Sequence, residues 1–176
     1  MTTLRPYGCR EEPASPLGPL APDLTRATTF AYSTAEELRA VGMGELPGEF
    51  YPRYGHPMGR LFEKMVAGLE DADGAVSFSS GMAALHAVFC GLLQVGDAIA
   101  VSRYVYGGVE AMVSADLCRF GIQVHRFDPF DKNWEEQAIT QGVKLVHVET
   151  PTNPLCRVLR LKEVTDRAHR CGAWVS

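Results

Sequence analysis

The sequence predicts an α/β protein with a mostly parallel sheet, and three observations support this class. From residue 75 onward, short apolar runs alternate with stretches of helical periodicity. The runs begin about every 20 to 30 residues and each is followed by a helical stretch, which is the pattern of βαβ units. The chain has 176 residues, 46% of them hydrophobic and 22% charged, which is an ordinary soluble composition with material for one core.

The first part of the chain is predicted to be irregular apart from two helices. Residues 1–26 carry five of the eleven prolines and predict an extended arm, either a disordered tail or an arm that docks on a neighbouring subunit. Ser33 and Thr34, followed by two glutamates, predict a capped helix that ends near Val41. Residues 51–57 contain two prolines and a glycine and predict a loop, and helical spacing of apolar residues predicts a helix over 58–70.

The remainder is predicted to alternate between strands and helices. The predicted strands are 75–78, 98–102, 122–127, 143–148 and 173–175. The predicted helices are 80–93, 108–119, 132–140 and 161–171, the last of them closed by Gly172. Because the last predicted strand lies at the very end of the chain, we expect a domain that is incomplete at its C-terminus.

Charge and cysteine usage narrow the classes of partner. There are 17 basic and 21 acidic side chains, a net charge of -4, and no run of five like charges, so we expect neither a nucleic-acid partner nor a membrane surface. The longest apolar stretch, 81–93, is too short to span a bilayer. No signal peptide is recognisable, and the five cysteines are scattered without a C-x-x-C pair, which favours a cytoplasmic protein with reduced thiols and a small-molecule partner.

Three predicted turns follow parallel strands, so they meet at one edge of the sheet, where open α/β sheets bind ligands. The first, Ser79 to Ala84, opens a helix whose free N–H groups could hold a phosphate, although Ser80 could simply cap that helix. The second carries Tyr106, which could cover a planar ligand or lie on the surface. The third carries Glu149 and Asn153, which either organise their loop or contact a ligand.

A metal site is not predicted. His86 and Cys90 are four residues apart on a predicted helix, as metal ligands can be, but that helix is apolar nearly all round and packing is the better interpretation. His125 and His147 lie within predicted strands and are interpreted as core or edge residues.

Four motifs, in this order and at these spacings, resemble the Cys/Met metabolism family of pyridoxal-phosphate (PLP) enzymes. They are Tyr51-Pro-Arg-Tyr-Gly-His-Pro, Ser80-Gly-Met-Ala-Ala, Tyr106-Gly-Gly and Glu149-Thr-Pro-Thr-Asn-Pro. That family includes cystathionine γ-synthase, cystathionine γ-lyase, methionine γ-lyase and O-acylhomoserine sulfhydrylases. The likeness runs from about Pro22 to Ser176 and implies a fold-type I, aspartate-aminotransferase-like large domain over 58–176, entered through an arm and subunit-contact segment over 1–57.

The resemblance also implies roles for single residues. Backbone amides of Gly81 and Met82 would hold the cofactor phosphate, and Tyr106 would stack on the pyridine ring and assist proton movement at the leaving group. Asn153 would hydrogen-bond the phenolic oxygen of the ring, with Glu149 shaping its loop. In the family, residues matching Tyr51 and Arg53 reach the phosphate of the adjacent subunit, which implies a homodimer as the smallest complete unit and a tetramer as the usual assembly.

Departures from the family pattern concern substrate preference and activity. The family commonly has Asn and Thr where this chain has His56 and Met58, and Thr where it has Val109. The family's Schiff-base lysine lies in a Ser-x-Thr-Lys context, which none of Lys132, Lys144 and Lys162 matches, and its pyridine-nitrogen aspartate has no counterpart either.

The resulting hypothesis is the N-terminal part of a transsulfuration-type PLP enzyme that acts on sulfur amino acids or O-acylhomoserine by γ-elimination or γ-replacement. The chain by itself is expected to be inactive. The alternatives are a truncated, non-catalytic oligomerising or regulatory module, a different fold-type I PLP enzyme, and an α/β domain that binds other phosphate ligands.

Overall fold

The computed structural model describes residues 21–138 and 142–176. The chain divides into two compact units between Ser77 and Phe78. The sequence predicts a domain boundary after residue 57. In the structure, the helix that follows residue 57 lies in the first of the two units. The assignment of the region from residue 58 onward to one functional domain stays a prediction.

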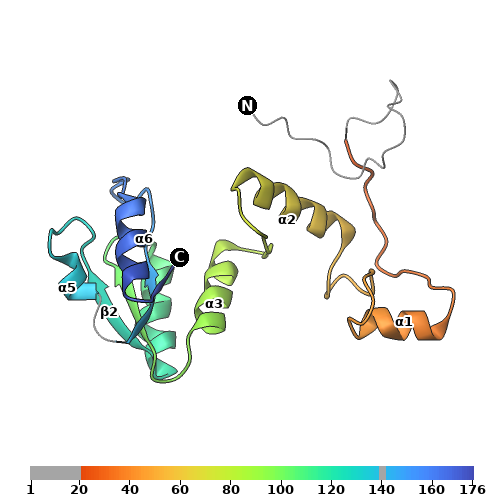
Figure 1. Cartoon of the computed structure of the whole chain (residues 1–176), viewed down its shortest axis with the longest axis horizontal. Helices are drawn as coiled ribbons and strands as arrows, with labels where there is room; N and C mark the ends of the chain where they lie inside the picture. The colour runs from red at the N-terminus through yellow and green to blue at the C-terminus, as the bar shows by residue number, and fades with distance from the viewer. Residues whose placement is uncertain (1–20, 139–141) are drawn as a thin grey trace. The chain divides into compact units, whose positions relative to one another are not determined.

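The described part of the first unit contains two helices joined by irregular chain (Figure 1). Helix α1 spans Ala35–Gly42, and its N-cap Thr34 accepts a hydrogen bond from the N–H of Glu37, whose carboxylate accepts from Ser33, as the sequence predicted. Helix α2 spans Pro57–Leu69 after the predicted loop. Of the predicted arm, residues 1–20 lie outside the described part of the chain, and residues 22–26 have no regular secondary structure.

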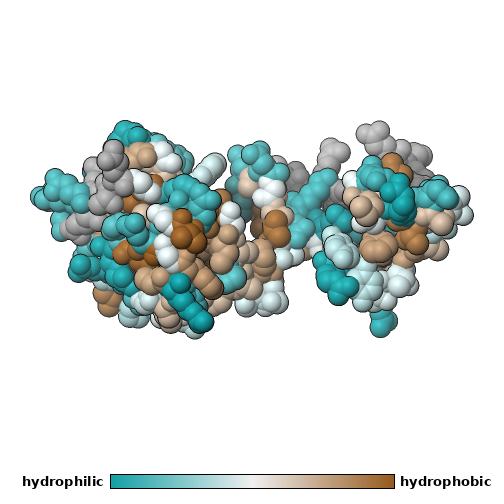
Figure 2. All heavy atoms as spheres, turned by 90° about the horizontal axis from the view of Figure 1, so that it is seen from below, coloured by the Kyte–Doolittle hydropathy of each residue, from teal (hydrophilic) through white to brown (hydrophobic). Residues whose placement is uncertain are grey.

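Few side chains of the first unit are buried. Ala40, Leu61 and Ala67 are the buried hydrophobic residues among residues 21–77. Phe62, Met65 and Leu69 form an exposed apolar stripe along one side of α2. Hydrophobic atoms are accordingly visible on the surface in Figure 2.

The second unit is a three-layer α/β structure, which confirms the predicted class. Its parallel sheet has the order β2-β1-β3-β4, with strands Ala98–Ser102 (β1), Gln123–Phe127 (β2), Val143–His147 (β3) and Trp174–Val175 (β4). The helices are Gly81–Leu92 (α3), Gly107–Ala111 (α4), the π-helix Met112–Leu117 (η1), Trp134–Ala138 (α5) and Leu161–Arg170 (α6).

Each face of the sheet has its own core because side chains alternate along a strand. Ile99 and Val101 of β1 pack with residues of α3, α4 and η1 on one face. Ala98 and Ala100 pack with residues of α5 and α6 on the other face. All five residues of β1 are buried, as expected for the central strand of a parallel sheet covered on both sides.

Three predicted elements differ from the structure. Residues 75–78 form no strand. A strand needs a neighbour with which to form backbone hydrogen bonds, and none of the described strands pairs with this segment. Residues 107–119 are helical throughout, close to the predicted 108–119, but the helix is π-helical over Met112–Leu117, where Met112, Val113 and Leu117 are buried. The helix predicted over 132–140 begins at Trp134, after a turn in which the carboxylate of Asp131 accepts from the N–H of Asn133, and residues 139 and 140 lie outside the described part of the chain.

Candidate functional site

The N-terminus of α3 forms the first part of the candidate site. The hydroxyl of its N-cap Ser80 accepts a hydrogen bond from the N–H of Ala83 over 3.1 Å. The preceding amides, of Gly81 and Met82, have no acceptor within the helix because they belong to its first turn. No acidic residue lies in that turn, and a Cβ added at Gly81 would meet nothing within 4 Å. The two amides and the positive end of the helix dipole are therefore open to an anion.

Tyr106 lies beside this helix end. It follows β1 and is the N-cap residue of α4, and its ring lies against Gly108, so that a Cβ at position 108 would be 2.5 Å from the ring atom Cε1. The same Cβ would be 3.2 Å from the sulfur of Met82. Tyr106, before α4, and Met82, in the first turn of α3, thus both lie against Gly108, and a larger residue at position 108 would have to move the ring. Tyr106 remains 54% exposed, which leaves room for a ligand on the ring.

Glu149 connects the second loop to the third. Both of its carboxylate oxygens lie 2.9 Å from the backbone nitrogen of Tyr106 and accept its N–H across 43 positions of sequence. A hydrogen bond to a charged acceptor is stronger than one between neutral groups. The carboxylate of Glu149 therefore holds Tyr106 at the start of α4, and the predicted role of Glu149 in shaping its own loop stays a prediction.

Glu110 fixes the other side of α4. Its carboxylate accepts hydrogen bonds from the guanidinium of Arg126 in β2 and from the hydroxyl of Ser114. The hydrogen bonds with Arg126 hold the pKa of Glu110 below its usual range, and Ser114 adds to this against the opposing effect of partial burial. Helix α4 and its N-cap Tyr106 are thereby tied to β2 through Arg126 and to the segment after β3 through Glu149.

The loop that carries Asn153 is folded onto itself. The buried Thr152 accepts from the N–H of Arg157 through its hydroxyl, and its own N–H donates to the carbonyl oxygen of Arg157. The hydroxyl of Thr150 accepts from the N–H of Leu159. Asn153 is exposed, and its amide has no hydrogen-bond partner among the described residues. The amide is therefore available to a ligand at this edge of the sheet.

His147 is the last residue of β3 and precedes Glu149 by two positions. It is 2% exposed, its ring meets Phe89 of α3 edge to face at 5.2 Å, and its Nδ1 lies 3.0 Å from the hydroxyl of Ser176. Its Nε2 is buried without a hydrogen-bond partner in the described structure, 4.0 Å from a carboxylate oxygen of Glu149. Burial lowers the pKa of His147 to about 4, so the imidazole is neutral at pH 7.

Tyr51 and Arg53 lie in the first unit, in the loop before α2. The guanidinium carbon of Arg53 is 5.1 Å from the ring centroid of Tyr51 and 5.8 Å from that of Tyr54. The two predicted residues therefore contact each other, and their predicted contact with the phosphate of an adjacent subunit stays a prediction.

Two contributors to this site were not predicted as such. Gly108 stands in the Tyr-Gly-Gly motif but received no role, although two adjacent glycines after an aromatic residue signal a close approach to the backbone. His147 was interpreted only as a core or edge residue. Its spacing of two from Glu149 in an extended segment could have placed both side chains on one face of the strand.

His86 and Cys90 do not pack as predicted. Both side chains are exposed, with the sulfur of Cys90 3.5 Å from Nε2 of His86. Within the described ranges, no three His, Cys, Asp or Glu side chains are grouped so that they could hold a metal ion. No helix in those ranges has the length and apolar character needed to cross a membrane.

Comparison with known proteins gives consistent results. Residues 9–176 match the model of a family described as Cys/Met metabolism PLP-dependent enzyme. The chain is 36% identical over 159 residues to O-succinylhomoserine sulfhydrylase of Pseudomonas aeruginosa, a match that covers 90% of this chain and 40% of that protein. It is 36% identical over 152 residues to L-methionine gamma-lyase of Pseudomonas deceptionensis, covering 86% of this chain and 38% of the relative.

Solved structures agree with these matches. A cystathionine gamma synthase from Xanthomonas oryzae pv. oryzae, crystallised with cystathionine, superposes with a TM-score of 0.79 at 29% identity, over 92% of this chain and 40% of the other. A Campylobacter jejuni protein assigned as an O-acetylhomoserine (thiol)-lyase, which contains N'-pyridoxyl-lysine-5'-monophosphate, gives a TM-score of 0.77 at 25% identity, over 85% and 37%. The chain thus spans about two fifths of the length of these relatives.

Proposed function

Because the chain belongs to the Cys/Met metabolism family of PLP-dependent enzymes, we propose that it forms the phosphate- and ring-binding part of a transsulfuration-type enzyme. The substrates would be sulfur amino acids or O-acylhomoserine, and the reaction γ-elimination or γ-replacement. When bound, the cofactor supplies an electron sink for negative charge that develops on the substrate.

The meeting of three loops at one sheet edge carries this proposal. The open amides of α3, the ring of Tyr106 on Gly108 beside Met82, and the carboxylate of Glu149 on the Tyr106 N–H belong to segments far apart in sequence. An anion site next to an aromatic ring fits the two ends of a phosphorylated pyridine. The donor set at this edge therefore suits the cofactor of the family.

Each residue has a defined task in this proposal. The N–H groups of Gly81 and Met82 bind the phosphate, while the ring of Tyr106 covers one face of the pyridine. The side-chain amide of Asn153 donates to the phenolic oxygen. The carboxylate of Glu149 accepts the backbone N–H of Tyr106 and so keeps Tyr106 in place. The hydroxyl of Tyr106 can then transfer a proton at the γ-substituent of the substrate.

We propose that the 176-residue chain binds the cofactor without turning substrate over. Its chemistry needs a lysine in the family's Ser-x-Thr-Lys context, and none of the lysines in this sequence has that context. Lys144 and Lys162 are instead paired with Asp97 and Asp166, at 2.9 and 2.6 Å.

We also propose that the chain self-associates in a reducing, cytoplasmic setting. The exposed apolar stripe of α2 lies in the same unit as Tyr51 and Arg53, the residues proposed to reach a neighbouring subunit. Cys90, Cys118, Cys156 and Cys171 are exposed free thiols, a state that a reducing compartment maintains.

A binding experiment with pyridoxamine 5'-phosphate tests the proposed function. This vitamer lacks the aldehyde, so it does not react with surface lysines and reports the non-covalent site alone. We expect equilibrium dialysis to show binding of pyridoxamine 5'-phosphate and much weaker binding of pyridoxamine, which lacks the phosphate. Gly81→Asp places a carboxylate at the open amides and should weaken phosphate-ester binding by about tenfold or more through charge repulsion.

The matched control is Gly91→Asp, which introduces the same charge at another open glycine of α3. It should bind pyridoxamine 5'-phosphate as the unmodified chain does. Equal loss of binding in both variants, or no loss in Gly81→Asp, would contradict the assignment of the phosphate site.

A further inference from the structure

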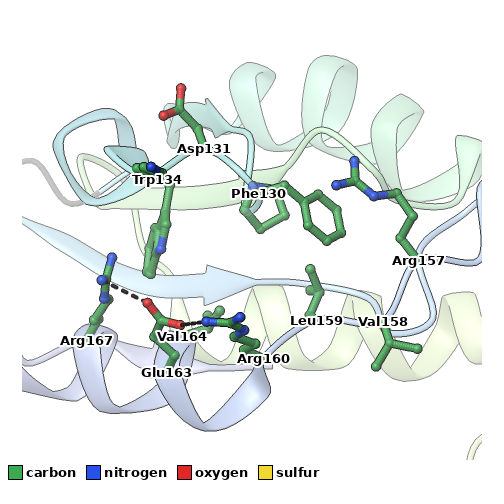
Figure 3. A pocket seen from close by; sticks show the side chains of 12 residues that line it. Phe130, Asp131, Trp134, Arg157, Val158, Leu159, Arg160, Glu163, Val164 and Arg167 are labelled. Atoms are coloured by element: carbon green, nitrogen blue, oxygen red, sulfur yellow. Dashed lines mark ion pairs between the residues drawn. The ribbon is translucent and has the colours of Figure 1, made fainter.

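A second pocket opens in the second unit between the loop after β2 and the first turns of α6 (Figure 3). Its volume is about 440 Å³, within the range of small-molecule sites. Charged side chains make up much of its wall, and Val158, Leu159, Val164 and Trp134 supply the apolar part. Trp134 contributes only an edge, because Phe127 stacks on it at 5.2 Å and the guanidinium carbon of Arg167 lies 5.5 Å from its ring centroid. None of the proposed PLP-binding residues lines this pocket.

The charges around the pocket do not cancel. Glu163 is neutralised by Arg167 at 2.8 Å and by Arg160 at 3.8 Å, as the dashed lines of Figure 3 show. Lys132 and Arg157 also line the pocket, and neither has a carboxylate partner among the described residues. Two cationic groups are thus left to interact with a ligand.

Arg157 is held in a fixed orientation. Its guanidinium carbon lies 3.2 Å from the ring centroid of Phe130 and 5.7 Å from that of Tyr104. The hydroxyl of Tyr104 donates to Asp128 over 3.0 Å, and the backbone of Arg157 is hydrogen-bonded to Thr152. A guanidinium stacked on a ring keeps the N–H donors at its edge free, in the fork geometry that matches a carboxylate.

The other features indicate the form of the ligand. Val158 is 75% exposed beside Arg157, so apolar surface adjoins the unpaired cation. Asp131, next to Lys132 in the sequence, also lines the pocket and would oppose a second negative charge on the ligand. We propose that this pocket binds a small organic monocarboxylate, with the carboxylate on Arg157 and Lys132 and the apolar body against Val158 and Leu159.

Fluorine NMR with 4-fluorobenzoate as the probe tests this site. We expect the full chain to broaden and shift the fluorine signal in a saturable way, while the neutral isostere 4-fluorobenzamide does not respond. Arg157→Gln removes the charge and should weaken 4-fluorobenzoate binding by about tenfold, the size expected for a charge-assisted hydrogen-bond pair. Arg119→Gln, at an exposed arginine outside the pocket, makes the same change in net charge and should bind normally.

A second variant keeps the test decisive if Arg157→Gln alters folding, which circular dichroism would detect. Val158→Asp leaves Arg157 in place and puts a competing carboxylate at the mouth of the pocket, so it should also lose 4-fluorobenzoate binding. The proposal is overturned by equal binding in Arg157→Gln and Arg119→Gln, by binding of the amide as tightly as the acid, or by displacement of the probe by equimolar inorganic phosphate.

Discussion

Gly108 is the residue on which the geometry of the candidate site depends most closely. A Cβ at this position would lie 2.5 Å from Cε1 of Tyr106, closer than Cβ atoms come to other atoms in proteins, and 3.0 Å from Cδ1, which is a tight contact. Gly108→Ala must therefore move the Tyr106 ring, while alanine favours the helix itself by about 1 kcal/mol over glycine. We expect pyridoxamine 5'-phosphate to bind several-fold more weakly to Gly108→Ala, with thermal stability within a few degrees of the unmodified chain.

The control is Gly107→Ala, at the neighbouring glycine, where an added Cβ would meet nothing within 4 Å. Equilibrium dialysis should give the two variants different affinities. If Gly107→Ala and Gly108→Ala bound the vitamer equally well, the ring of Tyr106 would not be a contact of the cofactor.

His147 makes the stability of the second unit depend on pH. Its pKa is about 4 in the folded chain against an ordinary value of 6.5, because burial disfavours the imidazolium. Between pH 4 and pH 6.5 the unfolded chain binds a proton at His147 and the folded chain does not. The contribution of His147 to the free energy of unfolding is therefore complete above pH 6.5 and decreases as the pH falls toward 4. The total loss is about 3 kcal/mol.

Urea unfolding from pH 7 to 4.5 measures this effect. His147→Gln should show a smaller decrease in unfolding free energy than the unmodified chain over that window, because glutamine does not titrate. The exposed His169 provides the control, and His169→Gln should keep the full decrease. Carboxylates with lowered pKa values, such as Glu110, lose their contribution at lower pH than this window. Parallel pH profiles for His147→Gln and the unmodified chain would contradict a neutral buried imidazole.

At the scale of elements, the sequence predicted what local patterning determines. The five residues of β1 were predicted with their observed bounds, because an unbroken apolar run between polar residues is the mark of a central parallel strand. The cap of α1 and the C-terminal end of α6 followed from residue types at a few positions. The parallel order also placed the three loops at one edge before any contact was known.

What the sequence did not predict depends on partners distant in the chain. Residues 75–78 have strand-like composition, but a strand also needs a neighbour, and pairing is not encoded locally. The hydrogen bonds from the Tyr106 N–H to Glu149 span 43 positions and require the register of β1 against β3. The orphaned Nε2 of His147 likewise arises from the packing of α3 and Ser176 around it.

Helix α2 presents the clearest unmet requirement for a partner. Phe62, Met65 and Leu69 share one side of this helix and are exposed. Burying one such side chain contributes about 1.5 to 3 kcal/mol, so Phe62→Asp should weaken self-association by about tenfold or more. Sedimentation equilibrium measures it, with Val95→Asp, at an exposed apolar residue of the second unit, as the control. A chain that sediments as a monomer at every concentration would contradict the proposed subunit contact.

The whole molecule consists of one unit with a developed core and one without. The second unit encloses its sheet between two helical layers, whereas the described part of the first unit buries only Ala40, Leu61 and Ala67 as hydrophobic side chains. We therefore expect the second unit to resist proteolysis longer, since local stability follows buried apolar contact. The relatives are longer proteins, and the chain spans about two fifths of their length.

Two-dimensional amide NMR of the labelled chain during titration with pyridoxamine 5'-phosphate identifies the residues that contact the ligand. We expect the largest saturable shifts at the amides of Gly81 and Met82, followed by those of Tyr106 and Gly108, and we expect pyridoxamine, which lacks the phosphate, to leave the first pair unmoved. Shifts concentrated elsewhere, for example around Arg157, with Gly81 and Met82 unaffected, would contradict the assignment of the phosphate site.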